Sequence, residues 1–157
     1  LHSLLTKNDI DLLFYPHPAM QKYVEQFNIN CDHVLVASAQ EYDMQKLLME
    51  SAILVTDYSS IYFDFAYMRK PLVYYQFDYE KYRKGQYQEG YFSYKRDGFG
   101  PVVEIEEDLL DELESIIKNN FKMAPQYREK VDGFFAFHDA NNCERTFRAI
   151  ANQKYGA

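Results

Sequence analysis

The fold of this chain is decided by the stretch LVTDYSSIYFDFA, residues 54–66. A short apolar run at 52–55 precedes a polar turn, and Ile61 and Phe65 then recur at helical spacing. This order predicts a buried strand, a tight turn and an amphipathic helix over residues 59–69. The polar residues therefore fall where strand becomes helix.

That polar turn is a candidate anion site. Asp57 or Ser59 can cap the predicted helix, whose N-terminus leaves backbone N–H groups unpaired and carries partial positive charge. The adjacent hydroxyls of Ser59 and Ser60 add donors that suit a phosphate or diphosphate. An ordinary helix cap explains the same residues, because serine and aspartate cap helices without any ligand. The residues alone leave both interpretations open.

Strands and helices alternate along the rest of the chain. Short apolar runs predict strands at 11–15, 33–37, 52–55, 72–75 and 102–105. Apolar residues at helical spacing predict helices at 1–7, 20–27, 59–69, 126–137 and 141–153. Two further helices are predicted, one that begins at residue 44 with Asp43 as a possible cap and one that follows residue 105. Residues 76–100 lack clean periodicity and are expected to form a long functional or mobile loop. Short buried strands joined by helices imply parallel pairing, hence a single domain with an open, doubly wound α/β sheet.

Length, composition and charge limit the class of protein. With 157 residues, 47% hydrophobic and 26% charged, the chain is expected to be globular. Its net charge of -7 disfavours nucleic acid as a partner, and no apolar run approaches the roughly 20 residues that span a bilayer. Cys31 and Cys143 show no metal-ligand spacing, so we expect a reducing, cytoplasmic setting and no metal. Because Leu1 lies inside a predicted helix, we expect a fragment of a longer protein.

Three polar segments are expected at one edge of the sheet. They follow Tyr15, Val55 and Tyr75, at the carboxyl ends of parallel strands, where doubly wound sheets bind their ligands. His17 lies in the first segment between two prolines, which fix the backbone and narrow the directions of the imidazole. That rigid position suits a site residue, although a loop histidine is more often a passive hydrogen-bonding group.

Five basic residues fall in one segment rich in Tyr and Gly: Lys81, Arg83, Lys84, Lys95 and Arg96. Since the whole chain is acidic, any phosphate-binding surface must be local, and this segment is a candidate for it. The alternative is a solvated loop, because acidic neighbours dilute the positive charge.

Several motifs, in matching order and spacing, resemble one family: YPHP at 15–18, TDYSS at 56–60 with DFA at 64–66, KP at 70–71, QFDYEKYRKG at 76–85 and GPVV at 100–103. Over residues 10–150 the chain resembles the C-terminal part of the CDP-glycerol glycerophosphotransferase family, the teichoic acid polymerases and their capsule-forming relatives. The resemblance implies the nucleotide-binding, Rossmann-like half of a GT-B glycosyltransferase fold. The other, N-terminal half would precede Leu1.

The resemblance also implies roles for particular residues. The family's His-Pro pair falls on His17, which would contact the donor phosphates or assist the developing charge in catalysis. Asp64 would orient the turn or touch the ribose, with an exposed helix carboxylate as the alternative. The implied donor-binding residues are Thr56, Asp57, Ser59, Ser60 and Asp64.

The implied reaction transfers glycerol phosphate from CDP-glycerol, or from a related CDP-polyol, to a polymer or lipid-linked acceptor. It needs no cofactor and would occur in the cytoplasm, at the inner face of the cell membrane. The chain departs from the family at Tyr15, where many members are basic, and near Ser93, where many are acidic, so donor and acceptor stay open.

Two other functions remain as alternatives. A GT-B nucleotide-sugar transferase would use the same diphosphate site. A receiver-like signalling domain with Asp57 as phospho-acceptor is disfavoured, because PHP at 16–18 stands where a receiver has an acidic pair.

Overall fold

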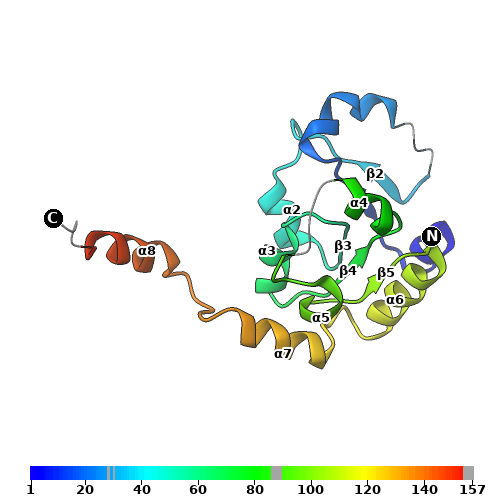
Figure 1. Ribbon diagram of the computed structural model, residues 1–157. Coiled ribbons are helices and arrows are strands. Elements are labelled where there is room, and N and C mark those ends of the chain that lie inside the picture. Colours follow the sequence, from blue (N-terminus) through cyan, green and yellow to red (C-terminus); the bar gives the residue numbers. More distant parts are fainter. Residues whose placement is uncertain (28, 30, 86–89, 154–157) are drawn as a thin grey trace.

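The computed structural model describes residues 1–27, 29, 31–85 and 90–153. Strands and helices alternate as the sequence predicts (Figure 1). The elements are α1 (His2–Asn8), β1 (Leu12–Phe14), the 3-10 helix η1 (Pro18–Gln26), β2 (Val34–Val36), α2 (Met44–Glu50), β3 (Leu54–Thr56), α3 (Tyr62–Tyr67), β4 (Leu72–Tyr75), α4 (Tyr79–Gly85), α5 (Tyr94–Asp97), β5 (Val102–Val103), α6 (Glu106–Lys118), α7 (Pro125–Phe134) and α8 (Asn142–Ala151).

The strand pairings are parallel and fall into two groups. β1 pairs with β2, with Leu13 opposite Leu35. In the second group β4 lies between β3 and β5, with Val55 opposite Val73 and Tyr74 opposite Val102. The predicted parallel α/β fold is confirmed, although the strands form two hydrogen-bonded sheets, of two and three strands, rather than one continuous sheet.

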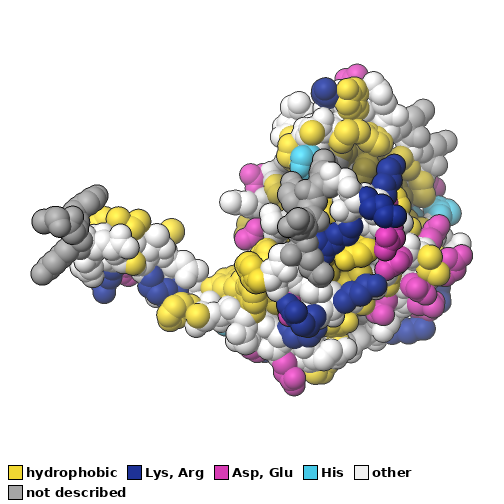
Figure 2. Space-filling view, in the orientation of Figure 1, with side chains coloured by type: hydrophobic (Ala, Val, Ile, Leu, Met, Phe, Trp, Pro, Cys, Tyr) yellow, Lys and Arg dark blue, Asp and Glu magenta, His cyan; other side chains and the backbone are white. Residues whose placement is uncertain are grey.

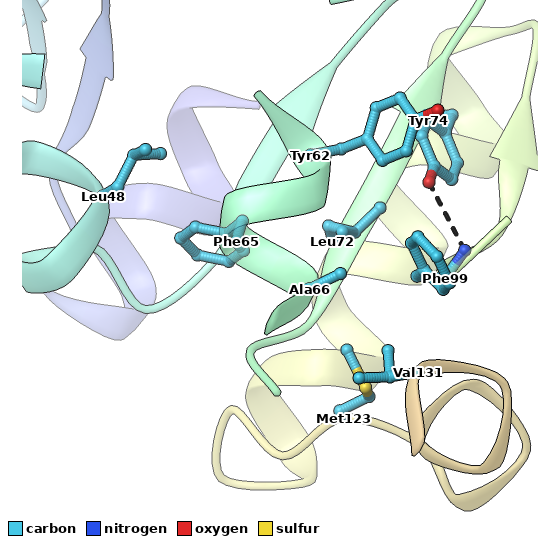
Figure 3. Close-up of a cluster of buried hydrophobic side chains, with 9 residues drawn as sticks. All are labelled: Leu48, Tyr62, Phe65, Ala66, Leu72, Tyr74, Phe99, Met123 and Val131. Carbon is cyan, nitrogen blue, oxygen red and sulfur yellow. Dashed lines mark hydrogen bonds between the residues drawn. The ribbon is translucent and has the colours of Figure 1, made fainter. Parts of the chain in front are cut away.

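Strand β4 is buried on both faces, as expected for the central strand of a doubly wound sheet. Leu72 and Tyr74 pack with Phe65 of α3 and Val131 of α7, and Figure 3 shows this cluster, including the bond from the Phe99 N–H to the Tyr74 hydroxyl. Val73 lies on the opposite face against α6. There it packs with the buried apolar residues Val103, Leu109 and Leu113.

The approach of the 98–101 segment to β4 depends on glycine. A Cβ at Gly100 would overlap the Leu72 carbonyl oxygen of β4, whereas one at Gly98 would overlap the Tyr94 carbonyl oxygen of α5. Only a residue without a side chain allows the backbone to pass so close. Gly100, in the GPVV motif, therefore serves the packing of the sheet.

Three sequence predictions are wrong in detail. Residues 76–100 are not one irregular loop, because they contain α4 and α5; residues 86–89 of this segment lie outside the described part of the chain. The expected helix at 20–27 is a 3-10 helix. The helix expected over 59–69 covers only Tyr62–Tyr67.

Helix α8 extends away from the rest of the molecule (Figure 1). It buries none of its residues, and Phe147 and Ile150 on it are 70% and 64% exposed. The Tyr67 hydroxyl donates to the Asp139 carbonyl at 2.9 Å, which ties the segment before α8 to α3. No helix within the described residues is long and apolar enough to span a membrane.

Candidate functional site

The turn between β3 and α3, residues 57–60, is stabilised by its own side chains; we call it the serine turn. The Asp57 Oδ1 atom accepts hydrogen bonds from the N–H groups of Tyr58, at 2.6 Å, and of Ser59, at 3.3 Å. The Ser59 Oγ atom accepts from the Ile61 N–H at 3.5 Å. Local hydrogen bonds of this kind, from a side chain to the nearby backbone, compete with helix formation. The helix consequently begins later than predicted, and its N-cap, Ile61, makes no side-chain capping bond.

The predicted donor-binding residues of this region differ in exposure. Ser59, Ser60 and Asp64 are exposed, with Asp64 in the first turn of α3. Asp57 is exposed too, but its Oδ1 is used by the turn itself. Thr56 is the last residue of β3 and is buried. Both serines of the turn are therefore exposed, and their hydroxyls can donate to a ligand.

Side chains from two other segments hold the carbonyl groups of the serine turn. The Gln76 side-chain amide, which follows β4 and is 1% exposed, donates to the Asp57 carbonyl at 3.2 Å. The Tyr94 hydroxyl donates to the Tyr58 carbonyl at 3.3 Å. The segments after β3 and after β4 thus meet at one edge of the sheet, as the parallel topology predicts.

Tyr58 connects the serine turn to α4. Its hydroxyl donates to the Asp78 carboxylate at 2.9 Å, and its ring stacks on the Tyr82 ring with centroids 3.6 Å apart and planes 1° apart. Burial and then the hydrogen bond to Asp78 raise the pKa of Tyr58. The hydroxyl therefore stays protonated, as its role of donor to a carboxylate requires.

His17 is exposed at the start of η1, which it caps. Its Nδ1 atom accepts a hydrogen bond from the Ala19 N–H at 3.2 Å. Because Nδ1 accepts, the neutral ring carries its proton on Nε2. The outer ring nitrogen is then a donor, which suits contact with a phosphate oxygen.

Gln21 fixes the loop that carries His17. Its amide nitrogen donates to the Pro16 carbonyl at 2.7 Å, and its amide oxygen accepts from the Ala39 N–H at 2.9 Å. This joins the segments that follow β1 and β2. Beside it lies an open cavity of about 460 Å³, lined by Tyr15 and residues 39–44.

The structure brings together only some of the predicted site residues. Asp57, Ser59 and Ser60 share one turn, and Asp64 follows one helical turn later. His17 follows β1 in the other strand group, and no hydrogen bond within the described residues joins its loop to the serine turn. The predicted site thus draws residues from both strand groups.

The basic residues of the 76–100 segment belong to α4 and α5. Figure 2 shows Lys and Arg side chains gathered there, with acidic side chains over α6. Lys95 pairs with Glu104 at 2.9 Å, which raises the pKa of Lys95. Arg83 donates to the Tyr79 hydroxyl at 3.1 Å, whereas Lys81 is exposed. The cations are thus gathered into a local patch on an acidic protein.

Lys70, from the KP motif, serves the scaffold. Its ammonium donates to the carbonyls of Leu48 at 3.0 Å, Ser51 at 2.9 Å and Met49, at the C-terminal end of α2. A cation there binds the helix carbonyls that lack partners. Lys70 also lies over the Phe65 ring, 5.4 Å from its centroid.

The sequence assigned no role to five residues that hold the candidate site in place: Gln21, Gln76, Asp78, Tyr82 and Tyr94. One signal was readable, because Gln76 and Asp78 are polar residues directly after a buried strand. Their partners lie 19 and 20 residues away, beyond any local pattern.

The histidines other than His17 contact other protein groups, and the Nδ1 atom of His2 lies 3.1 Å from the Sγ atom of Cys31. His33 lies 3.0 Å from Asp11, and His138 stacks on Tyr67. Cys31 and Cys143 do not form a disulfide bond. Within the described residues, no three His, Cys, Asp or Glu side chains gather as a metal site.

Taken together, the fold and the two polar segments define a Rossmann-like α/β domain with its candidate site beyond the strand ends. The chain belongs to the CDP-Glycerol:Poly(glycerophosphate) glycerophosphotransferase family, which matches residues 1–152. It is 39% identical over 144 residues to the minor teichoic acid biosynthesis protein GgaB of Bacillus subtilis (strain 168), covering 92% of this chain and 15% of that protein.

Two further proteins extend the comparison. A teichoic acid poly(glycerol phosphate) polymerase of the same organism is 28% identical over 108 residues, covering 69% of this chain and 14% of the relative. The solved structure of the wall teichoic acid polymerase TagF superposes with a TM-score of 0.69 at 26% identity, covering 96% of this chain and 36% of TagF. This likeness confirms the predicted fold class, the Rossmann-like half of a GT-B fold. The chain spans a minor part of each of these proteins.

Proposed function

We propose that this chain supplies the donor-binding half of a transferase that moves glycerol phosphate, or a related polyol phosphate, from a CDP-linked donor to a polymer or lipid-linked acceptor. The family match over residues 1–152 carries the proposal. The exposed hydroxyls of Ser59 and Ser60, on a turn held at the carboxyl edge of the sheet, supply donors for a diphosphate. The imidazole of His17 adds a third donor through Nε2.

In the proposed reaction, a terminal hydroxyl of the acceptor attacks the phosphorus atom next to glycerol. A new P–O ester bond forms, the bond from that phosphorus to the bridging oxygen breaks, and CMP leaves with the electron pair. Negative charge grows on the bridging and terminal oxygens, where fixed hydrogen-bond donors stabilise the transition state. The proton of the attacking hydroxyl would pass to a base outside this chain.

We further propose that residues 1–157 form one domain that works against an N-terminal half, at the inner face of the cell membrane. The partial coverage of the relatives supports this, since the chain spans 36% of TagF. Exposed apolar residues on α8, including Phe147 and Ile150, would be covered by that half. Of the remaining predicted residues, Asp64 would touch the ribose, and Asp57 would act chiefly by shaping the turn.

The experiment that tests the proposal is calorimetric titration of the chain with CDP, UDP and ADP. We expect weak binding of CDP in preference to the other two, and no transferase activity, because half of the cleft is absent. A preference for UDP would favour the nucleotide-sugar transferase instead. If none of the three nucleotides binds, the donor site itself is wrongly assigned.

A further inference from the structure

Tyr58 occupies the centre of the serine turn, but its side chain makes its contacts with another segment. It stands between Asp57, whose carboxylate shapes the turn, and Ser59, whose hydroxyl is exposed. The Tyr58 hydroxyl donates to Asp78, the residue directly before α4. A residue of the turn is thereby bonded to the start of a helix 20 positions further along the chain.

A hydrogen bond to a carboxylate is stronger than a neutral one, and this bond is partly buried. Asp78 also organises α4 itself, because its carbonyl accepts the N–H of Tyr82 at 2.9 Å. A shift of Asp78 would therefore disturb the serine turn and the first turn of α4 together.

The second contact is the ring stack between Tyr58 and Tyr82. The rings are parallel within 1°, with centroids 3.6 Å apart, and the Tyr94 ring meets Tyr58 edge-on at 6.3 Å. Aromatic pairs of this kind stabilise a fixed relative orientation beyond simple burial. The turn is thus held to α4 by a polar and an apolar contact at once.

Helix α4 carries positive charge beside the turn. Lys81 and Lys84 on it are exposed, and Lys84 lies 3.9 Å from Glu80 of the same helix. Because Tyr58 joins the two elements, the hydroxyls of the turn and the cations of α4 keep one relative arrangement. A diphosphate that contacts both would meet donors that are already in place, which is the condition for electrostatic catalysis.

We propose that Tyr58, Asp78 and Tyr82 are positioning residues that fix the serine turn against α4, so that Ser59 and Ser60 are held ready for the donor diphosphate. The inference rests on the proposed function and names residues that act through the serines rather than on the substrate.

Steady-state kinetics with CDP-glycerol, in the transferase that contains this chain, test the polar contact. Tyr58→Phe removes the hydroxyl and keeps the ring, and Asp78→Ala removes its acceptor. We expect each change to lower kcat/KM about 10-fold, mainly through kcat, because the donors are misplaced for the transition state. The double variant should lose no more than either single variant, since both remove the same bond. Asp78→Asn keeps an acceptor oxygen and should recover to within about 3-fold of the unaltered enzyme.

The stack and a matched control complete the test. Tyr82→Leu removes the stacked ring and should also lower kcat/KM about 10-fold. Tyr67→Phe deletes a tyrosine hydroxyl that bonds the Asp139 carbonyl elsewhere, and should leave kcat/KM within about 2-fold. Unchanged kinetics in Tyr58→Phe and Asp78→Ala, or losses that multiply in the double variant, would overturn the inference. Failure of the unaltered protein to bind CDP or to use CDP-glycerol would instead contradict the proposed function, and the inference with it.

Discussion

The serine turn and the His17 loop both follow a parallel strand, yet they are held in different ways. Side chains from distant segments hold the turn: Gln76 and Tyr94 bind its carbonyls, and Tyr58 is tied to α4. The His17 ring is held locally, through a backbone N–H two residues further on. Changes near the turn should therefore act through the scaffold, whereas a change at His17 removes the functional group directly.

The largest effect is expected at His17. Replacing it with alanine should lower kcat/KM about 100-fold or more, the scale for loss of a preorganised donor to a charged transition state. The fold should persist, although loss of the cap to Ala19 costs about 1 kcal/mol of stability. Steady-state kinetics of the transferase and thermal unfolding measure the two effects.

Two conservative variants separate the roles of the two ring nitrogens. His17→Asn places an acceptor near the position of Nδ1 and keeps the cap, while His17→Gln reaches toward the position of Nε2 with a donor. We expect wild-type stability with low activity for asparagine, and partial recovery of activity for glutamine. If asparagine retains the full rate, His17 is only a helix cap. Equal losses with asparagine and glutamine would point to proton transfer or an imidazolium.

The sequence predicts a helix well where its apolar stripe extends over more than two turns, and it predicts a helix cap well where the capping residue lies next to the helix. Helix α6 follows from its apolar stripe and its acidic first turn, and both are observed. Asp43 caps α2 as predicted, because its Oδ1 accepts the Lys46 N–H at 2.9 Å. Helices α4 and α5 were missed because their sequences, YEKYRKG and YKRD, contain no aliphatic residue and so show no apolar stripe.

The candidate site was predictable in part. Residue type and position at a strand end predicted Ser59 and Ser60 as candidates, and both are exposed, but these signals did not predict the start of the helix behind them. The side chains of Asp57 and Ser59 bond their own turn, and this local choice shortens the helix. The contacts of Gln76 were not predictable, because they depend on how β3 and β4 pair in three dimensions.

The serine hydroxyls should have the next largest effect. Ser59→Ala and Ser60→Ala should each raise the KM for the donor and lower kcat, since a lost hydrogen bond to a charged oxygen costs about 1.5 to 3 kcal/mol. That corresponds to about 10-fold or more in kcat/KM. Ser115→Ala, at an exposed position on α6, is the matched control and should change nothing. Unchanged kinetics together with lowered thermal stability would show that the serines only support the turn.

No effect on the rate is expected at Lys70, although this residue belongs to a motif shared with the family. Lys70→Met keeps the apolar stem over Phe65 but leaves carbonyls at the end of α2 without their cation. The free energy of unfolding should fall by about 1.5 to 3 kcal/mol. Urea unfolding should therefore show a lower midpoint concentration and an unchanged m value. Lys46→Met on the same helix is the control, because its pair with Glu50 spans 3.8 Å between exposed side chains and is worth less than about 1 kcal/mol. A lower rate without loss of stability would instead show that Lys70 acts in the candidate site and not only in the scaffold.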